Sequence, residues 1–339
     1  MSAPMFSLHG QTAMVTGCTR GIGQAVAIGL AGPFQWLQAS KPPSFKPPSS
    51  KPPSSKPPTL SHPPLYLPLL HAALLLRPPL GLARRGTKSQ LLPLWPPLPH
   101  PPPLPALVHD GRCVADSCAP IAQRDASQTS TKDAIEKLGR KAWIYAADMA
   151  EQESVTALTP KVLGDGHQVR ILVTCAGIQR RHPCERFPDG DFNEVNLHAV
   201  FTLCRDVGAH MLGLEPSATT GRRGSIVNYA SLLTFQGGLT VPAYAASKGA
   251  VGQITKSFAN EWTARGVTVN AVAPGYIDTE MNTALLNDPG RLAGINARIP
   301  AGRWGRPDDF KGTTVYLASR AGAYVSGHTL VVDGGWMGR

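Results

Sequence analysis

The chain has 339 residues, including 34 glycines and 33 prolines, and carries a formal net charge of +11 at pH 7. Residues 32–120 contain 23 of the 33 prolines, and their nine basic and two acidic side chains account for +7 of that charge. The positive charge therefore belongs mainly to one segment, and it does not indicate a protein that binds nucleic acid or a membrane surface. The remainder is nearly balanced in charge and has a size that one hydrophobic core can support.

Targeting signals and metal motifs are not evident in this sequence. The N-terminus has no basic region followed by an apolar run, and the most apolar stretch, residues 69–76, is too short to span a bilayer. No pair of cysteines has C-x-x-C spacing, so we expect free thiols in a reducing compartment and no metal site. These features predict a cytoplasmic protein with no membrane association.

The first predicted elements form a strand, a glycine-rich turn and a helix. Residues 12–16 are apolar and β-prone and stop at Gly17, whereas residues 24–31 carry apolar side chains at helical spacing. The turn between them contains three glycines, Gly17, Gly21 and Gly23. Such a turn lets the pyrophosphate of a dinucleotide approach the backbone at the N-terminus of a helix.

A proline-rich tract interrupts the pattern over residues 32–120. Residues 41–59 repeat the unit Lys-Pro-Pro-Ser, and proline both fixes φ and removes a backbone donor, so we expect polyproline II or disorder there. Because the tract falls where a core strand is expected, we interpret it as translated intron sequence. Residues 108–115 and 118–122 are the two candidates for a replacement strand.

Regular elements resume near Ile121. Strands are predicted at residues 141–147, 170–174, 225–229, 267–272 and 329–332, and helices at residues 132–138, 154–163, 192–211, 244–265 and 308–319. Strands that alternate with helices predict an α/β fold with a doubly wound parallel sheet of the Rossmann type. We expect residues 6–31 and 121–339 to form this single domain.

Tyr244 and Lys248 are four residues apart and therefore share one face of the predicted helix. A nearby ammonium stabilises a phenolate, which would lower the pKa of Tyr244 toward the working range of a general acid or base. Ser231 precedes the pair by thirteen residues, just after a predicted strand, and its hydroxyl could bind the reacting oxygen.

These motifs, in this order, resemble the short-chain dehydrogenase/reductase family over about residues 6–30 and 123–339. The resemblance implies that Tyr244 exchanges a proton with the substrate oxygen, that Lys248 lowers its pKa and that Ser231 polarises the carbonyl. It also implies that Asn196 supports a proton relay. The residues it implies for binding NAD or NADP are Gly17, Arg20, Gly21, Ile22, Gly23, Asp148, Ala176, Gly177, Tyr244, Lys248, Pro274, Gly275, Ile277 and Thr279.

A finer resemblance, in residues 177–182, 231–238 and 299–305, is to the branch of that family that acts on deoxy-keto sugar acids. It implies interconversion of a secondary alcohol and a ketone on a deoxy sugar acid such as 2-deoxy-D-gluconate, by a homo-oligomer, usually a tetramer. A carboxylate substrate needs cationic side chains, and arginine provides bidentate geometry. The candidate substrate residues are Arg180, Arg181, His182, Gln236 and Arg303.

Several alternatives remain open at this point. The shared motifs also fit a 3-ketoacyl or gluconate 5-reductase, and the insertion predicts a catalytically impaired protein if it disrupts the cofactor site. In that case the proline repeat could serve as a ligand for aromatic-lined grooves. Asp125 suits NAD, whereas Arg124 and Arg20 suit NADP. The short spacing from Gly177 to Asn196 predicts a rotated helix, which would misplace that asparagine.

Overall fold

The computed structural model describes residues 4–32, 118–123, 125, 127–193 and 197–339. The described strands form one parallel sheet in the order β3-β2-β1-β4-β5-β6-β7, which confirms the predicted doubly wound α/β fold. The strand order reverses direction between β1 and β4, and such a switch point is where open α/β sheets bind ligands. The strands are β1 Thr12–Thr16, β2 Cys118–Gln123, β3 Lys141–Ala146, β4 Val169–Thr174, β5 Gly224–Tyr229, β6 Val267–Pro274 and β7 Thr329–Val332.

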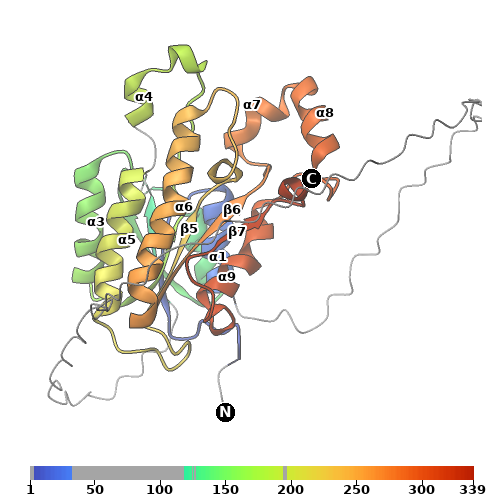
Figure 1. Cartoon of the computed structure of the whole chain (residues 1–339). Helices are drawn as coiled ribbons and strands as arrows, with labels where there is room; N and C mark the ends of the chain where they lie inside the picture. The colour runs from blue at the N-terminus through green and yellow to red at the C-terminus, as the bar shows by residue number, and fades with distance from the viewer. Residues whose placement is uncertain (1–3, 33–117, 124, 126, 194–196) are drawn as a thin grey trace, which may run out of the picture. The chain divides into compact units, whose positions relative to one another are not determined.

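Helices cover both faces of the sheet (Figure 1). One face carries α3 (Gln152–Gly164), α5 (Leu197–Leu212) and α6 (Pro242–Trp262), and the other carries α1 (Gly21–Ala31), α2 (Ser130–Lys137) and α9 (Lys311–Ala318). Each face has its own buried apolar cluster. Strand β5 is buried along its whole length and β6 nearly so, and neither shows the apolar-polar alternation of a strand with one face in solvent.

The chain re-enters the sheet at Cys118, three residues before the predicted boundary at Ile121. Strand β2 pairs in parallel with β1, where Val15 lies opposite Ile121, and along its full length with β3. The second strand therefore occupies its place beside β1. It contains residues 118–122, one of the two candidate replacement strands; residues 108–115 and the repeat at 41–59 lie outside the described residues.

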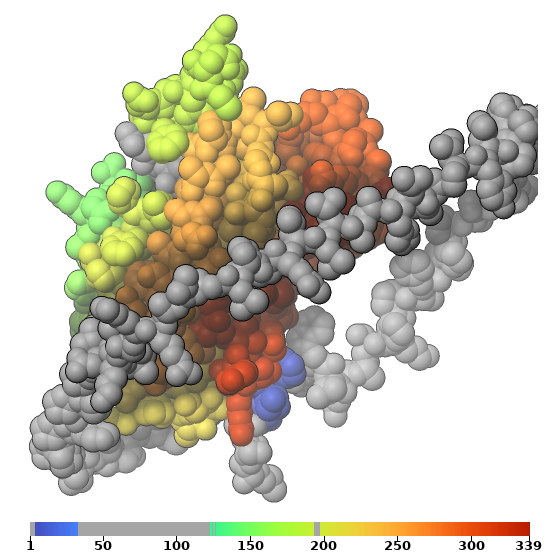
Figure 2. Space-filling view, in the orientation of Figure 1, coloured from blue at the N-terminus to red at the C-terminus, as the bar shows by residue number. Residues whose placement is uncertain are grey.

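Two regions differ from the predicted elements. The helix predicted over residues 192–211 is described as α4 (Asp189–Asn193) and α5, and Asn196 lies between them, outside the described residues. The segment after β6, where no element was predicted before residue 308, contains two further helices, α7 (Thr283–Leu286) and α8 (Pro289–Arg298). Asp288 caps α8 by accepting hydrogen bonds from the next two backbone amides that follow Pro289. The segments carrying α4 and α7–α8 project on either side of α6 (Figure 2).

Candidate active site

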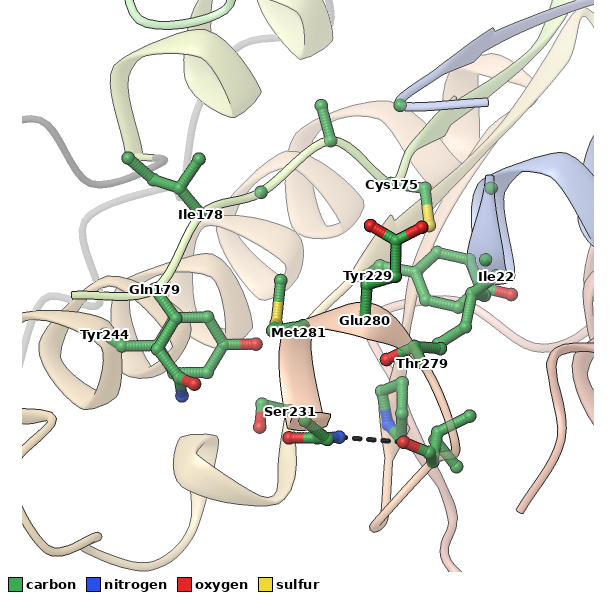
Figure 3. Close-up of a pocket in the computed structure, with 18 of the residues that line it drawn as sticks. Ile22, Cys175, Ile178, Gln179, Tyr229, Ser231, Tyr244, Thr279, Glu280 and Met281 are labelled. Atoms are coloured by element: carbon green, nitrogen blue, oxygen red, sulfur yellow. Dashed lines mark hydrogen bonds between the residues drawn. The ribbon is translucent and has the colours of Figure 1, made fainter. Parts of the chain in front are cut away.

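A cavity of about 1250 Å³ opens at the carboxyl ends of β1, β4, β5 and β6. All fourteen residues predicted to bind the dinucleotide line it, and so does Ser231. Tyr244, Gln179 and Ser231 lie at one side of the cavity, and Ile22, Tyr229 and Cys175 lie at the other (Figure 3). The sheet therefore brings together residues that are more than 200 positions apart in the sequence.

The three glycines of the turn line the cavity with backbone atoms and no side chains. Gly17 has φ +69°, and a Cβ on it would lie 2.6 Å from the backbone of Ala176. A Cβ on Gly23 would lie 2.2 Å from the carbonyl oxygen of Gly17. The hydroxyl of Thr16 accepts hydrogen bonds from the amides of Cys175 and Ala176 and so ties the end of β1 to the chain after β4. Only glycine fits at positions 17 and 23 without displacing this backbone.

The backbone surface of the glycine turn fits a dinucleotide phosphate. Arg20, which precedes α1, makes no side-chain capping hydrogen bond, and the first turn of the helix holds no acidic residue. The first amides of α1 therefore face the cavity with the positive end of the helix dipole, an arrangement that suits an anion. The cavity is larger than the usual small-molecule pocket and can accommodate a cofactor together with a substrate.

Ser231 and Tyr244 bring two hydroxyl groups to one end of the cavity, which we call the substrate end. Ser231 follows β5 and caps a short 3-10 helix, whereas Tyr244 lies in the first turn of α6. Burial raises the pKa of Tyr244 to about 12, and the hydrogen bond with Ser231 and the charge of Arg181 oppose that rise. The direction is opposite to the lowered pKa predicted from Lys248, because desolvation of the phenolate exceeds the favourable interactions.

Lys248 lies one turn after Tyr244 and is only 4% exposed. Its Nζ donates a hydrogen bond of 2.6 Å to the carbonyl oxygen of Tyr229 and lies 5.5 Å from the centre of the Tyr244 ring. Burial lowers the pKa of Lys248 to about 8. This lysine can therefore change its charge near neutral pH, directly beside the phenol.

The predicted substrate residues divide into two groups. Arg180, Arg181 and Gln236 line the cavity, and the amide oxygen of Gln236 accepts a hydrogen bond from the Trp336 indole. His182 and Arg303 are not among the lining residues. His182 lies 2.6 Å from the carboxylate of Asp191, and Arg303 makes a bidentate ion pair with Asp309. Asp191 and Asp309 thus occupy two of the side chains that the sequence motif had suggested for binding the substrate.

The structure also places residues in the cavity that the sequence motifs did not indicate, chiefly Arg291, Tyr276, Gln179 and Glu280. Arg291 belongs to α8, and the Asp288-Pro289 pair at the start of that helix is the signal that could have revealed it. Glu280 forms an ion pair with Arg20 across the mouth of the cavity.

The adenosine end of the cavity contains Asp125. Its carboxylate accepts hydrogen bonds from the amide and the hydroxyl of Ser127, at 2.9 and 2.7 Å, which lowers its pKa. Arg124 lies outside the described residues.

The described part of the chain contains no group of three or more His, Cys, Asp or Glu side chains that could hold a metal ion. None of its helices combines the length and the apolar character that a membrane span needs.

A doubly wound sheet whose cavity lies at the switch point is the architecture of a nucleotide-binding α/β protein. A family model described as Enoyl-(Acyl carrier protein) reductase matches residues 117–337. The chain is 46% identical over 214 residues to the 2-dehydro-3-deoxy-D-gluconate 5-dehydrogenase of Pseudoalteromonas atlantica, covering 62% of this chain and 82% of the relative. The chain therefore belongs to the short-chain dehydrogenase/reductase family of oxidoreductases.

Two solved structures resemble this chain closely. One is described as a 2-deoxy-D-gluconate 3-dehydrogenase from Agrobacterium tumefaciens with bound NADP; it is 32% identical, with a TM-score of 0.67 and 99% coverage of both chains. The other is a gluconate 5-dehydrogenase from Burkholderia cenocepacia in complex with NADP and tartrate, 28% identical, with a TM-score of 0.68 and coverage of 99% of this chain and 98% of that one.

Proposed function

We propose that this protein is an NAD(P)-dependent dehydrogenase that interconverts a secondary alcohol and a ketone on a deoxy sugar acid such as 2-deoxy-D-gluconate. The observation that carries the proposal is that Ser231, Tyr244 and Lys248 line the same cavity as the glycine turn. The relative from Pseudoalteromonas atlantica and the two NADP-bound structures support this substrate class and this cofactor.

The bound nicotinamide would supply or accept the hydride at the substrate carbon. Tyr244 holds the proton that passes to or from the substrate oxygen, and Ser231 orients that oxygen through its hydroxyl. Lys248 lies against the Tyr244 ring, anchored on Tyr229, where its positive charge stabilises the phenolate left after proton donation. The relay role of Asn196 stays a prediction, because that residue lies outside the described part of the chain.

The test has two stages on the purified full-length protein. Enhancement of NADH and NADPH fluorescence measures cofactor binding and decides between the two nucleotides. Turnover is then measured with keto sugar acids (2-deoxy, 3-deoxy and 5-keto) and with a 3-ketoacyl thioester. We expect binding of at least one nucleotide and the highest kcat/KM on a deoxy-keto acid. Failure to bind either nucleotide overturns the proposed function, and preference for the thioester overturns the substrate class.

We also propose that the segment from residue 32 to residue 117 is an insertion of translated intron origin within one domain made of residues 6–31 and 118–339. The second part of this domain begins three residues before the predicted boundary at Ile121, because β2 starts at Cys118. The support is that β2 pairs with both β1 and β3, so the sheet is continuous across the interruption. Sequencing of the mature transcript tests the origin, and a transcript that encodes residues 41–59 in frame would refute it.

We further infer a cytoplasmic homo-oligomer, by resemblance a tetramer. The free thiols of Cys175, Cys184 and Cys204 suit a reducing compartment.

The aromatic pair Phe201 and Phe258 stacks on the outer side of α5 and α6, where Phe201 is 43% exposed. Such an apolar surface suits a subunit interface. Light scattering coupled to size-exclusion chromatography measures the oligomeric state, and a monomer at micromolar concentration would contradict it.

A further inference from the structure

Two arginines from distant parts of the chain line the cavity that contains Tyr244. Arg181 lies on the loop after β4, and Arg291 lies in the first turn of α8, within the segment after β6. Arg181 is half-buried and Arg291 is exposed. Burial lowers the pKa of Arg181, and the charges of Arg291 and Tyr244 also act on it. The guanidinium of Arg181 therefore lies within electrostatic reach of Arg291 and of the phenol of Tyr244.

Among the residues that the structure describes, no carboxylate forms an ion pair with Arg181 or Arg291. The guanidinium of Arg181 donates to the neutral amide oxygen of Gln179 at 2.7 Å, which uses one of its five N–H groups. By contrast, Arg20 pairs with Glu280 and Arg303 pairs with Asp309. Arg181 and Arg291 thus line the same cavity, and neither is neutralised by a carboxylate in the part of the chain that the structure describes.

This pair of cations has a free-energy cost that an anion would relieve. Like charges repel more strongly in a partly buried wall than in bulk water, and half-burial also weakens the hydration of Arg181. A carboxylate has two oxygens and accepts bidentate hydrogen bonds from one guanidinium while contacting a second. Asp278 and Glu280 also line the cavity, but in the described structure neither forms an ion pair with these arginines, and Glu280 pairs with Arg20.

We propose that Arg181 and Arg291 together bind the carboxylate of the substrate and thereby set its distance from Tyr244. This proposal rests on the proposed function, and it names the residues that select an acid over a neutral sugar. Arg181 belongs to the fixed end of the sheet, whereas Arg291 is supplied by the α7–α8 segment (Figure 1). Binding of an acid would thus also hold α8 against the cavity.

The relative solved with tartrate is consistent with this chemistry, since tartrate is a hydroxy acid with two carboxylates. The test uses D-gluconate and D-glucitol, which differ only in whether the first carbon is a carboxylate or a neutral alcohol. Calorimetry in the presence of saturating NADP⁺ measures the Kd of each for the wild type, Arg291→Gln and Arg181→Gln. The control is Arg298→Gln, whose guanidinium lies on the same helix but over the Trp336 ring, 4.0 Å from its centre.

We expect the wild type to bind D-gluconate at least about tenfold more tightly than D-glucitol, a difference of about 1.4 kcal/mol. Arg291→Gln and Arg181→Gln should each abolish that preference and leave the Kd for NADP⁺ unchanged, whereas Arg298→Gln should preserve it. A preference that survives in Arg291→Gln, or wild-type protein with no preference, overturns the carboxylate site. If the wild type fails to bind NADP⁺, the proposed function is overturned instead. The failure of the carboxylate site and the failure of the proposed function are therefore distinguishable.

Discussion

The ammonium nitrogen of Lys248 lies 5.5 Å from the centre of the Tyr244 ring and is held there by the carbonyl oxygen of Tyr229. The backbone at the end of β5 therefore fixes the position of a charge on the face of the phenol. Lys248 is buried and Tyr244 is partly buried, and desolvation moves their pKa values in opposite directions, up for Tyr244 and down for Lys248. Burial thus shifts both side chains toward their neutral forms, although Lys248, with a pKa of about 8, still carries most of its positive charge at pH 7.

Tyr244→Phe should abolish turnover and leave nucleotide binding intact. The substitution removes the hydroxyl that exchanges the proton and keeps the ring that packs beside Lys248. General acid–base groups contribute about 10²- to 10⁴-fold, so kcat should fall by at least about a hundredfold. Steady-state kinetics and NADPH fluorescence measure the two effects. Tyr324→Phe, at a fully exposed tyrosine, is the matched control, and wild-type turnover by Tyr244→Phe would disprove the assignment.

Lys248 should make the stability of the protein depend on pH. Its folded-state pKa of about 8 is below the ordinary value of 10.5, so between these values the unfolded state binds more protons. The free energy of unfolding of the wild type should therefore rise, relative to Lys248→Met, from pH 8 to pH 10, by on the order of 2 kcal/mol. Urea denaturation followed by tryptophan fluorescence measures the difference. Lys256→Met, at an exposed position on the same helix, should show no such trend.

Gly23→Ala should destabilise the fold and weaken nucleotide binding together. A Cβ at this position would lie 2.2 Å from the carbonyl oxygen of Gly17, so the glycine turn must move. Forced overpacking of this kind costs about 1–3 kcal/mol. Gly164→Ala, at the end of α3 where a Cβ meets nothing within 4 Å, should leave stability unchanged or slightly increase it. Equal thermal midpoints for the two variants would contradict the packing argument.

Glu280→Gln should tighten NADPH binding by no more than about fivefold, because exposed ion pairs are worth up to about 1 kcal/mol. The substitution releases Arg20 from its ion pair at the mouth of the cavity and leaves its charge available to the cofactor phosphates. Both side chains are more than two-thirds exposed, so the thermal midpoint should not change measurably. Glu261→Gln on α6 is the control. Weaker binding by Glu280→Gln would show that this carboxylate helps to hold the nucleotide.

Sequence patterns predicted the helices and strands whose ends are marked by local residues such as glycines. Strands β1 and β7 have the predicted bounds, because each is a short apolar run that ends at a glycine turn or an Asp-Gly-Gly sequence. Helix α8 was missed because it is only ten residues long and buries a single side chain, so its clearest sequence signal is the Asp288-Pro289 start. Periodicity detects a helix that buries a broad face, and in α8 only Ile295 is buried.

The site was predicted to a similar extent. The glycine turn and the Tyr244–Lys248 pair are local motifs, so their place in one cavity could be anticipated from the chain order. Whether each arginine pairs with a carboxylate could not be anticipated, because that depends on partners that only the tertiary fold brings close. Arg303 pairs with Asp309, whereas Arg181 donates to the amide oxygen of Gln179 and has no ion pair among the described residues. Similarly, the rise in the pKa of Tyr244 comes from the depth of the cavity rather than from its sequence neighbours.

The pairing of Val15 with Ile121 has a kinetic consequence. The two residues are about a hundred positions apart in the chain, and they must meet before β2 can take its place beside β1. Closing so long a loop adds little to the equilibrium cost, yet non-local pairing of parallel strands slows folding. On the other side, β3 follows β2 closely and can pair with it early. The β2–β3 unit should therefore form as a separate block, and its docking onto β1 should be the late, slow step by which the nucleotide site is completed.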